Sequence, residues 1–288
     1  MQLLNFRREL GDEKSFSSID GADCFHCFCG DKFCSQEERL RRGQGRRRFN
    51  HWCCLIERCC TAPIIEDLTK GKNVEFCITH PDTNKKDSTR ARVKVTATGG
   101  KLKDAVVFIE EIDGGKPWGD LGKANYTFEK CDINEKMLAV RKPTKAEAKD
   151  KKSDILTVTN KDPEILHNPH GYSVAGANRK TLFNKPLPSQ GDVAYVTKNI
   201  KRLKKKKDKH FFLQCDQHNF MEADARIVWN PYYAITGADG AFKIDGVPAG
   251  KYKVTAWQPY VGESSQDVTV GAGAAKANFT LVAKAAKK

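Results

Sequence analysis

Residues 211–221 read FFLQCDQHNFM and place a cysteine, a histidine and a methionine at intervals of three, as Cys215, His218 and Met221. The apolar run before Cys215 predicts a strand that ends at the cysteine, with the histidine and the methionine in the turn beyond it. A thiolate, an imidazole and a thioether form a soft ligand set, which suits copper better than magnesium or calcium. The stretch therefore predicts three ligands of a copper ion.

A fourth donor is predicted upstream, in the stretch LTVTNKDPEILHNPH of residues 156–170. His167 follows a predicted strand, so a β framework can bring its side chain to the loop of Cys215. His170 lies three residues further on and is the alternative ligand. Each residue taken alone has an ordinary explanation, because cysteine is often buried, methionine fills cores and single histidines form hydrogen bonds at surfaces. Their joint spacing favours a mononuclear copper site.

Short strands separated by turn signals predict an all-β fold. Candidate strands with β-branched residues or alternating polarity lie over 73–80, 91–98, 104–112, 136–142 and 154–160. Strands this short and this frequent are typical of a β-sandwich or a barrel. The lysine run of residues 204–207 predicts a solvated hairpin tip, and no aromatic residues alternate with these lysines to stack on bases. The pattern argues against nucleic-acid binding.

The chain changes character after Pro231. The stretch YYAITGADGAFKIDGVPAGKYKVTAWQPY predicts strands joined by tight turns at Asp239-Gly240 and at residues 246–250. Two more strands follow before a short lysine-rich tail. This second all-β module contains no histidine and no cysteine, so metal chemistry is not expected in it.

Most cysteines lie in an arginine-rich N-terminal stretch. Of the eleven in the chain, eight fall before residue 62: Cys24, Cys27, Cys29, Cys34, Cys53, Cys54, Cys59 and Cys60. They suggest either a zinc or iron–sulfur knuckle or a leader without compact structure, and the absence of paired C-x2-C spacing favours the leader. If Cys215 binds metal, Cys77 and Cys131 are left as a possible disulfide pair, which would imply an oxidising compartment.

The composition limits the classes of function. The formal net charge is +14 in 288 residues, which makes acidic partners plausible by electrostatic steering. The sequence contains no apolar run long enough to span a membrane, and the N-terminus lacks the apolar core of a secretory signal. We find no paired acid and base, nucleophile elbow or phosphate loop, so an enzyme is not expected.

Together these motifs resemble a known family. LTVTNKDPEILHNPH followed by a Cys-x2-His-x2-Met loop is similar to the cupredoxins, and most of all to the short ligand loop of the amicyanin type. The module ITGADGAFKIDGVPAGKYKVTAWQPYVGE resembles the carboxypeptidase regulatory-like, or transthyretin-like, β-sandwich. The combination, over about residues 72–283, resembles bacterial exported proteins described as methylamine-utilisation-like.

The resemblance implies one type 1-like copper ion bound by His167, Cys215, His218 and Met221. It also implies that Asn168 ties the two ligand loops together. His218 would then lie in an exposed loop with Phe220 and Pro169 near it, and this apolar rim is where a redox partner would approach.

The sequence thus predicts an all-β protein, in which a cupredoxin-like Greek-key β-sandwich at 68–228 precedes a small transthyretin-like β-sandwich at 229–284. Residues 1–67 are expected to form a poorly structured leader. The predicted function is copper binding with one-electron transfer in the periplasm or outside the cell, with an acidic redox protein such as a c-type cytochrome as partner. No nucleic acid and no membrane span are expected. The alternative is a non-redox binding or scaffold protein, for carbohydrate or protein at the cell surface, with a vestigial metal loop.

Overall fold

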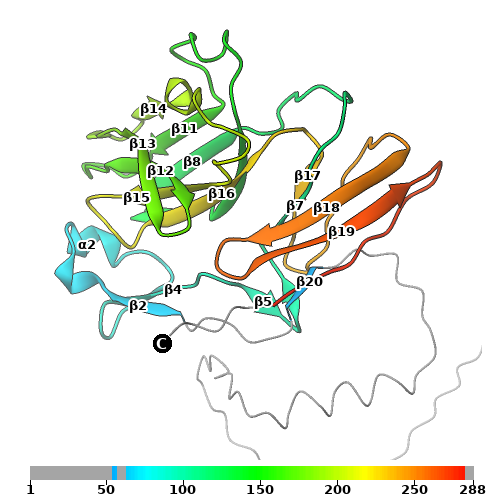
Figure 1. The fold of residues 1–288 in the computed structure, drawn as a ribbon. Helices are drawn as coiled ribbons and strands as arrows, with labels where there is room; N and C mark the ends of the chain where they lie inside the picture. Colours follow the sequence, from blue (N-terminus) through cyan, green and yellow to red (C-terminus); the bar gives the residue numbers. More distant parts are fainter. Residues whose placement is uncertain (1–53, 57–62, 283–288) are drawn as a thin grey trace, which may run out of the picture. The chain divides into compact units, whose positions relative to one another are not determined.

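The computed structural model describes residues 54–56 and 63–282, and this part of the chain consists mainly of β-strands (Figure 1). Helical structure within it is limited to three short elements: the 3-10 helices η1 (Leu68–Lys70) and η2 (Thr197–Ile200), and the α-helix α2 (Val74–Cys77). None of the described helices has the length and apolar character needed to cross a bilayer. The predicted all-β class is confirmed.

The first β-sandwich consists of two facing sheets. The larger has the order β10-β16-β15-β12-β13, with strands Met137–Arg141, Glu222–Val228, His210–Cys215, Pro169–Ala175 and Asn178–Asn184. The smaller has the order β14-β11-β8-β9, with strands Val193–Tyr195, Leu156–Asn160, Ala124–Glu129 and Asp132–Ile133. Alternate residues of β16, such as Ala223, Ala225 and Ile227, point into one shared core that Tyr126 and Phe128 of β8 also fill. This arrangement is a β-sandwich, as predicted.

The register of the larger sheet brings the two predicted ligand stretches together. Strand β12 pairs antiparallel with β15, and Pro169 lies opposite Cys215 at the end of that ladder. His167 lies two residues before β12 and forms an isolated bridge with Leu187. The start of β12 and the end of β15 therefore lie side by side, so residues 48 positions apart meet at one edge of the sandwich.

The second sandwich is built from three separate stretches of the chain. One sheet has the order β17-β7-β18-β19, with strands Tyr233–Ile235, Val106–Ile109, Gly250–Gln258 and Gly262–Val270 (Figure 1). The other has the order β20-β1-β6-β5, with strands Phe279–Leu281, Cys54–Ile56, Lys101–Leu102 and Ala97–Thr98. Its core joins Val107 and Leu102 with Val254 and Phe279.

This pairing changes the predicted division of the chain at residues 228 and 229. Strand β7 forms where the sequence predicted a strand, but it pairs with β17 and β18 rather than with the first sandwich. All four of its residues are buried. Val107 and Ile109 face the core of the second sandwich, and Val106 and Phe108 pack with Met137 of β10 in the first. The first sandwich is thus inserted between two of the three stretches that form the second.

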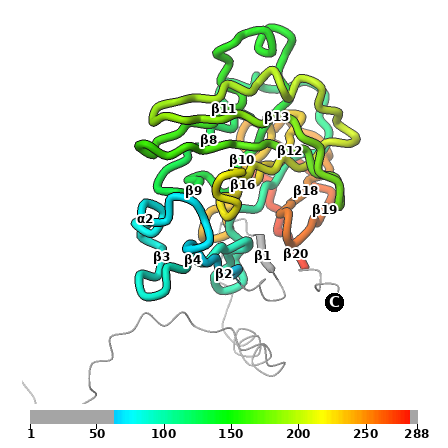
Figure 2. Tube along the Cα trace, turned by 90° about the vertical axis from the view of Figure 1, so that its left-hand side faces the viewer, coloured from blue at the N-terminus to red at the C-terminus, as the bar shows by residue number. Residues whose placement is uncertain are grey.

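Residues 64–92, called the cap segment below, form a small unit of their own. It contains a sheet of order β2-β4-β3, with strands Ile64–Asp67, Thr89–Arg92 and Thr83–Asn84, together with η1 and α2. The strand predicted over 73–80 is wrong, since residues 74–77 form a helical turn instead. Asn73 begins it in the left-handed conformation at φ 52°, and a Cys77–Cys131 disulfide fixes its end. Figure 2 shows α2 beside β9, the strand that follows Cys131.

The predicted leader is described only in part. Strand β1 lies between β20 and β6, so residues 54–56 belong to a sheet in a stretch where no compact structure was predicted. The other residues before 63 lie outside the described part of the chain, and so do the cysteine spacings that suggested a knuckle.

Candidate metal centre

Three donor atoms converge at the edge of the first sandwich where β12 begins and β15 ends. Cys215 Sγ lies 3.6 Å from His167 Nδ1 and 3.8 Å from His218 Nδ1. The two imidazole rings have centroids 5.0 Å apart. All three side chains are buried, with exposed fractions of 0% for His167 and Cys215 and 1% for His218. The structure therefore brings together three of the four predicted ligands.

The spacing of these atoms fits a metal ion between them. Protein metal–nitrogen and metal–sulfur bonds, with zinc as the reference, are about 2.0 and 2.3 Å long, and at an angle of 120° they hold the two donor atoms about 3.7 Å apart. The two observed sulfur–nitrogen distances lie on either side of this value. A cysteine sulfur with two histidine nitrogens in a trigonal arrangement is the donor set of blue-copper sites. The residues present thus fit copper.

Backbone hydrogen bonds hold Met221 beside Cys215 and His218. Its N–H donates to the carbonyl of His218 at 2.9 Å, and its own carbonyl accepts from the N–H of Cys215 at 3.1 Å. The Met221 side chain is fully buried in the core of the first sandwich. Its role as the weak fourth ligand stays a prediction.

Asn168 connects the two ligand loops, as the resemblance implied. Its backbone N–H donates to Cys215 Sγ at 3.4 Å, and its side-chain amide donates to Asp216 at 3.3 Å. In return, the N–H of Asp216 donates to the carbonyl of Asn168 at 3.0 Å. These bonds hold the cysteine loop against the residue that follows His167.

Electrostatics prepare the cysteine for binding a metal. Burial by itself would raise the pKa of the Cys215 thiol, but the hydrogen bonds from His167, His218 and the Asn168 amide outweigh it and lower the pKa to about 6. Metals bind the thiolate form of cysteine, so this environment favours the required protonation state near neutral pH.

Asp162 orients His167 from behind. Its carboxylate lies 2.9 Å from His167 Nε2 and also accepts backbone N–H groups of Lys130 and Cys131, the latter at 2.8 Å. Burial would lower the pKa of His167, but the hydrogen bonds with Asp162 and Cys215 outweigh it and raise the pKa. On metal binding, His167 would keep the proton on Nε2 that faces Asp162 and release the one on Nδ1, which would then present a lone pair beside Cys215.

The structure does not bring the alternative ligand His170 to the site. Its Nδ1 lies 3.1 Å from Asp216 and 2.8 Å from the Tyr172 hydroxyl, and its Nε2 lies 3.0 Å from Thr181. Both ring nitrogens are therefore engaged in a polar network on β12 and β13.

The cap segment covers the edge where His218 was expected to be exposed. A ring nitrogen of His218 lies within 4.8 Å of both sulfur atoms of the Cys77–Cys131 disulfide, and its Nε2 is buried without a hydrogen-bond partner. Beside it, the Arg90 guanidinium lies 5.5 Å from the Phe220 ring centroid. The prediction of an exposed histidine with an open apolar rim is wrong, because this segment packs over both side chains.

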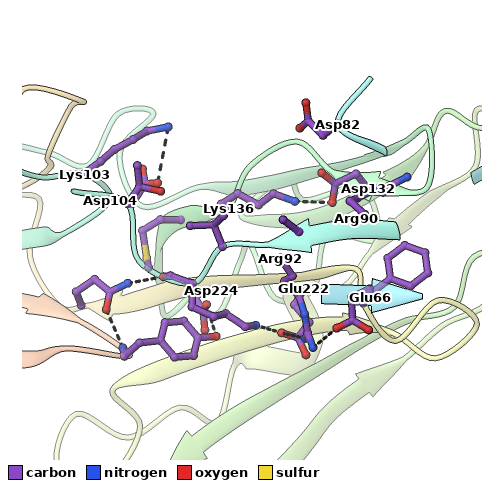
Figure 3. Close-up of a pocket in the computed structure, with 18 residues that line it drawn as sticks. Glu66, Asp82, Arg90, Arg92, Lys103, Asp104, Asp132, Lys136, Glu222 and Asp224 are labelled. Carbon is purple, nitrogen blue, oxygen red and sulfur yellow. Dashed lines mark hydrogen bonds and ion pairs between the residues drawn. The ribbon is translucent and has the colours of Figure 1, made fainter. Parts of the chain in front are cut away.

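Ionic contacts fasten the cap segment to the ligand loop. Arg92 contacts both Glu66 and Glu222, the residue directly after Met221, and Lys94 contacts Glu222 as well (Figure 3). Arg90 donates from its two terminal nitrogens to the carbonyls of Cys131 and Cys77, at 2.7 and 2.6 Å. The carbonyls of both bridged cysteines are thereby bound to one buried guanidinium.

Sequence reasoning missed Asp162 and Arg90. Asp162 precedes His167 by five residues within the quoted stretch, and a carboxylate so close to a candidate ligand was the available signal. Arg90 carried no comparable signal, because its partners lie 13 and 41 residues away.

Comparisons with known proteins cover parts of the chain. The family model for polysaccharide lyase family 4, domain II, matches residues 230–278, so the carboxypeptidase regulatory-like identification is not confirmed. No curated protein matches the chain.

Two solved structures resemble parts of it weakly. A copper-containing nitrite reductase from Thermus scotoductus is 12% identical with a TM-score of 0.25, over 47% of this chain and 25% of that one. A reduced amicyanin variant is 13% identical with a TM-score of 0.24, over 42% of this chain and 91% of that one.

Proposed function

We propose that this protein binds one copper ion through His167 Nδ1, Cys215 Sγ and His218 Nδ1, with Met221 as a weak fourth ligand, and that it transfers single electrons. The observation that carries the proposal is the convergence of one thiolate and two imidazoles at distances of 3.6 and 3.8 Å. When bound, copper supplies a one-electron redox couple whose two states differ in preferred geometry.

The residues of the chain would keep that geometry fixed. Asp162 orients the His167 ring, the Asn168 amide positions the Cys215 sulfur, and the buried core excludes water from all three donors. A site that hardly rearranges needs little reorganisation when an electron enters or leaves. Because four protein donors leave no open position for a substrate, the donor set supports electron transfer rather than catalysis.

The disulfide supports a location outside the reducing cytosol, in the periplasm or beyond it. Structural disulfides such as Cys77–Cys131 form and persist in oxidising compartments. The net charge of +14 supports an acidic redox partner, whose rate of association would fall as salt is added.

Copper binding is tested by adding Cu(II) to the purified protein and recording its visible spectrum. We expect an intense thiolate-to-copper band at one equivalent, and its loss in Cys215→Ser. His170→Gln is the matched control, since this neighbouring histidine is bonded to Asp216 and Thr181, and it should keep the band. A wild-type protein without the band, or a Cys215→Ser variant that retains it, would overturn the proposal.

The covered His218 also favours a second candidate, a non-redox binding protein in which the metal is structural. A side chain exposed by only 1% offers a partner no direct contact with the ligand. Reduction separates the two candidates. If the copper band bleaches with ascorbate and returns with a mild oxidant over repeated cycles, electron transfer is supported, whereas a band that never responds supports the structural role.

A further inference from the structure

A groove of about 650 Å³ lies beside the first sandwich at the end of β15 opposite the metal centre. Strand β15 runs from His210, which lines the groove, to Cys215, the proposed ligand. On the neighbouring strands the groove is lined by Val174 of β12 and Arg226 of β16, which both pair with His210. A volume of this size is in the range of small-molecule sites, which span about 300–1,000 Å³.

Arg226 is a buried cation at this groove with an incomplete set of partners. Its side chain is 5% exposed and its Nε has no hydrogen-bond partner. The guanidinium lies over the rings of Phe108 and Trp257, 4.5 and 5.1 Å from their centroids. Glu263 approaches only to 3.8 Å and is itself half exposed. A guanidinium has five N–H donors. Among the described residues, no carboxylate lies within ordinary hydrogen-bond distance of the Arg226 guanidinium, so its charge is poorly compensated.

The other charges of the groove add to this excess. Arg179, Lys207 and Lys209 also line it and are exposed, and the Arg179 guanidinium is held over the Phe212 ring at 4.5 Å. Against these four cations, counting Arg226, the lining contributes a single carboxylate, that of Glu263. His210 adds no free charge, because it pairs with Asp224 at 2.6 Å.

We propose that this groove binds a multivalent oxyanion, a polycarboxylate or a polyphosphate, with Arg226 and Arg179 as its forked donors. Planar guanidinium groups match carboxylate and phosphate oxygens in paired hydrogen bonds. A bound oxyanion supplies the acceptors that Arg226 lacks, and the lysines add attraction at the rim. The site does not depend on the proposed copper function, since it lies at the other end of β15.

Calorimetric titration of metal-free protein tests the proposal, with citrate and tripolyphosphate as probes and acetate as the monovalent control. The metal is left out because citrate itself binds copper. We expect one saturable site for at least one probe and no measurable binding of acetate. If only citrate binds, the ligand carries carboxylates, and if only tripolyphosphate binds, it carries phosphates.

Two variants and one control locate the site. Arg179→Ala removes an exposed side chain, so the fold should be kept while the dissociation constant rises about tenfold, as expected for a lost charge-assisted pair. Arg226→Lys keeps the charge and removes the fork, and should also weaken binding. Arg202→Ala removes an exposed arginine that does not line the groove and should leave binding unchanged. Equal weakening by Arg179→Ala and Arg202→Ala, or no saturable binding of either probe, would show only non-specific attraction and overturn the proposal.

Discussion

The Asp162 carboxylate contacts the proposed ligand His167 and the backbone of Lys130 and Cys131, in the loop that carries the disulfide. Asp162→Asn keeps the shape but removes the charge and one of the two acceptor oxygens, so the hydrogen bond that orients the His167 ring is weakened. Changes of this kind behind a metal ligand weaken metal binding about 10–100-fold. We expect a loss in that range when copper affinity is measured by competition with a chelator.

The same variant should also unfold more easily. An asparagine has one acceptor oxygen where Asp162 uses two, so a buried N–H of Lys130 or Cys131 would lose its partner, at a cost of about 1–3 kcal/mol. The control is Asp267→Asn, which changes an exposed aspartate of β19. Copper affinity equal to that of wild type in Asp162→Asn would show that this carboxylate does not position the ligand.

A second carboxylate predicts how stability depends on pH. The hydrogen bonds with Arg141, at 2.5 and 2.7 Å, lower the pKa of Glu147 to about 2. The carboxylate therefore contributes stability that is fully present above its unfolded pKa of about 4.3 and is lost as the pH falls toward 2. Because the Glu147 side chain is about one-third exposed, we discount the full linkage energy to about 1–2 kcal/mol at pH 7.

Urea unfolding of Glu147→Gln checks this prediction. The variant should be less stable than wild type at pH 7, and the difference should shrink as the pH is lowered below 4. Glu75→Gln, an exposed glutamate of α2, serves as the control and should show no such pH-dependent gap. A constant difference at all pH values would mean that charge pairing is not the cause.

At the residue scale, spacing was enough to predict that the side chains of His167, Cys215 and His218 converge and not enough to predict their surroundings. Cys215 and His218 lie three residues apart on one loop, and His167 follows a strand that the sequence marks clearly. The burial of His218 could not be predicted in this way, because the disulfide sulfur atoms beside its ring belong to Cys77 and Cys131, which lie far away in the sequence.

At the scale of elements, the cap segment decides access to the metal centre. Its disulfide closes a loop of 54 residues, which by chain entropy stabilises the fold by about 4 kcal/mol. The double variant Cys77→Ser and Cys131→Ser should therefore unfold at lower urea concentration. Its cap segment would remain attached through noncovalent contacts, such as those of Arg90 with Cys131, of Arg92 with Glu222 and of Lys72 with Gln217.

Copper release should respond to the same change. With copper bound, we expect the double variant to lose its visible band to a chelator at least tenfold faster than the wild type, since the segment over His218 opens more often. Arg92→Gln, which weakens the contact with Glu222 but keeps the disulfide, should give an intermediate rate. Equal release rates in all three proteins would show that the cap segment does not limit access.

The elements themselves were predicted with uneven success. Strands β7, β10, β11 and β15 form where alternation or β-branched residues predicted them. The strand predicted over 73–80 is wrong because Asn73 takes the left-handed conformation and residues 74–77 form a helical turn, which the alternation of residues did not indicate. The disulfide at the end of that turn was anticipated as a possible pair.

At the scale of the whole molecule, strands that are neighbours in the sequence do not always belong to the same sheet. Short apolar strands do not show which sheet they will join, so β7 was assigned to the nearer domain. In the structure it lies between β17 and β18, and β17 has no other strand partner among the described residues. The second sandwich therefore depends on residues that come more than 120 positions before its main part.

That dependence makes a prediction about fragments. Five of the fourteen buried residues in the second core come from the upstream stretch: Val95, Leu102, Ala105, Val107 and Ile109. Each of the larger ones contributes about 1.5–3 kcal/mol when buried, and their sum approaches the whole stability of a typical domain. A fragment of residues 230–282 alone should not fold, and its circular dichroism should show no cooperative thermal transition.

Joining residues 95–112 to residues 230–282 through a glycine–serine linker should restore folding even without β1, because β7 pairs again with β17 and β18 and the side chains of Leu102 and Val107 return to the core. The matched control carries Val107→Asp in the joined fragment, which places an unpaired charge in the core and should abolish the transition again. Cooperative unfolding of residues 230–282 by themselves would show that this segment folds independently and does not need the upstream strands. The inserted first sandwich, and with it the metal centre, would then be attached to that module rather than built into it.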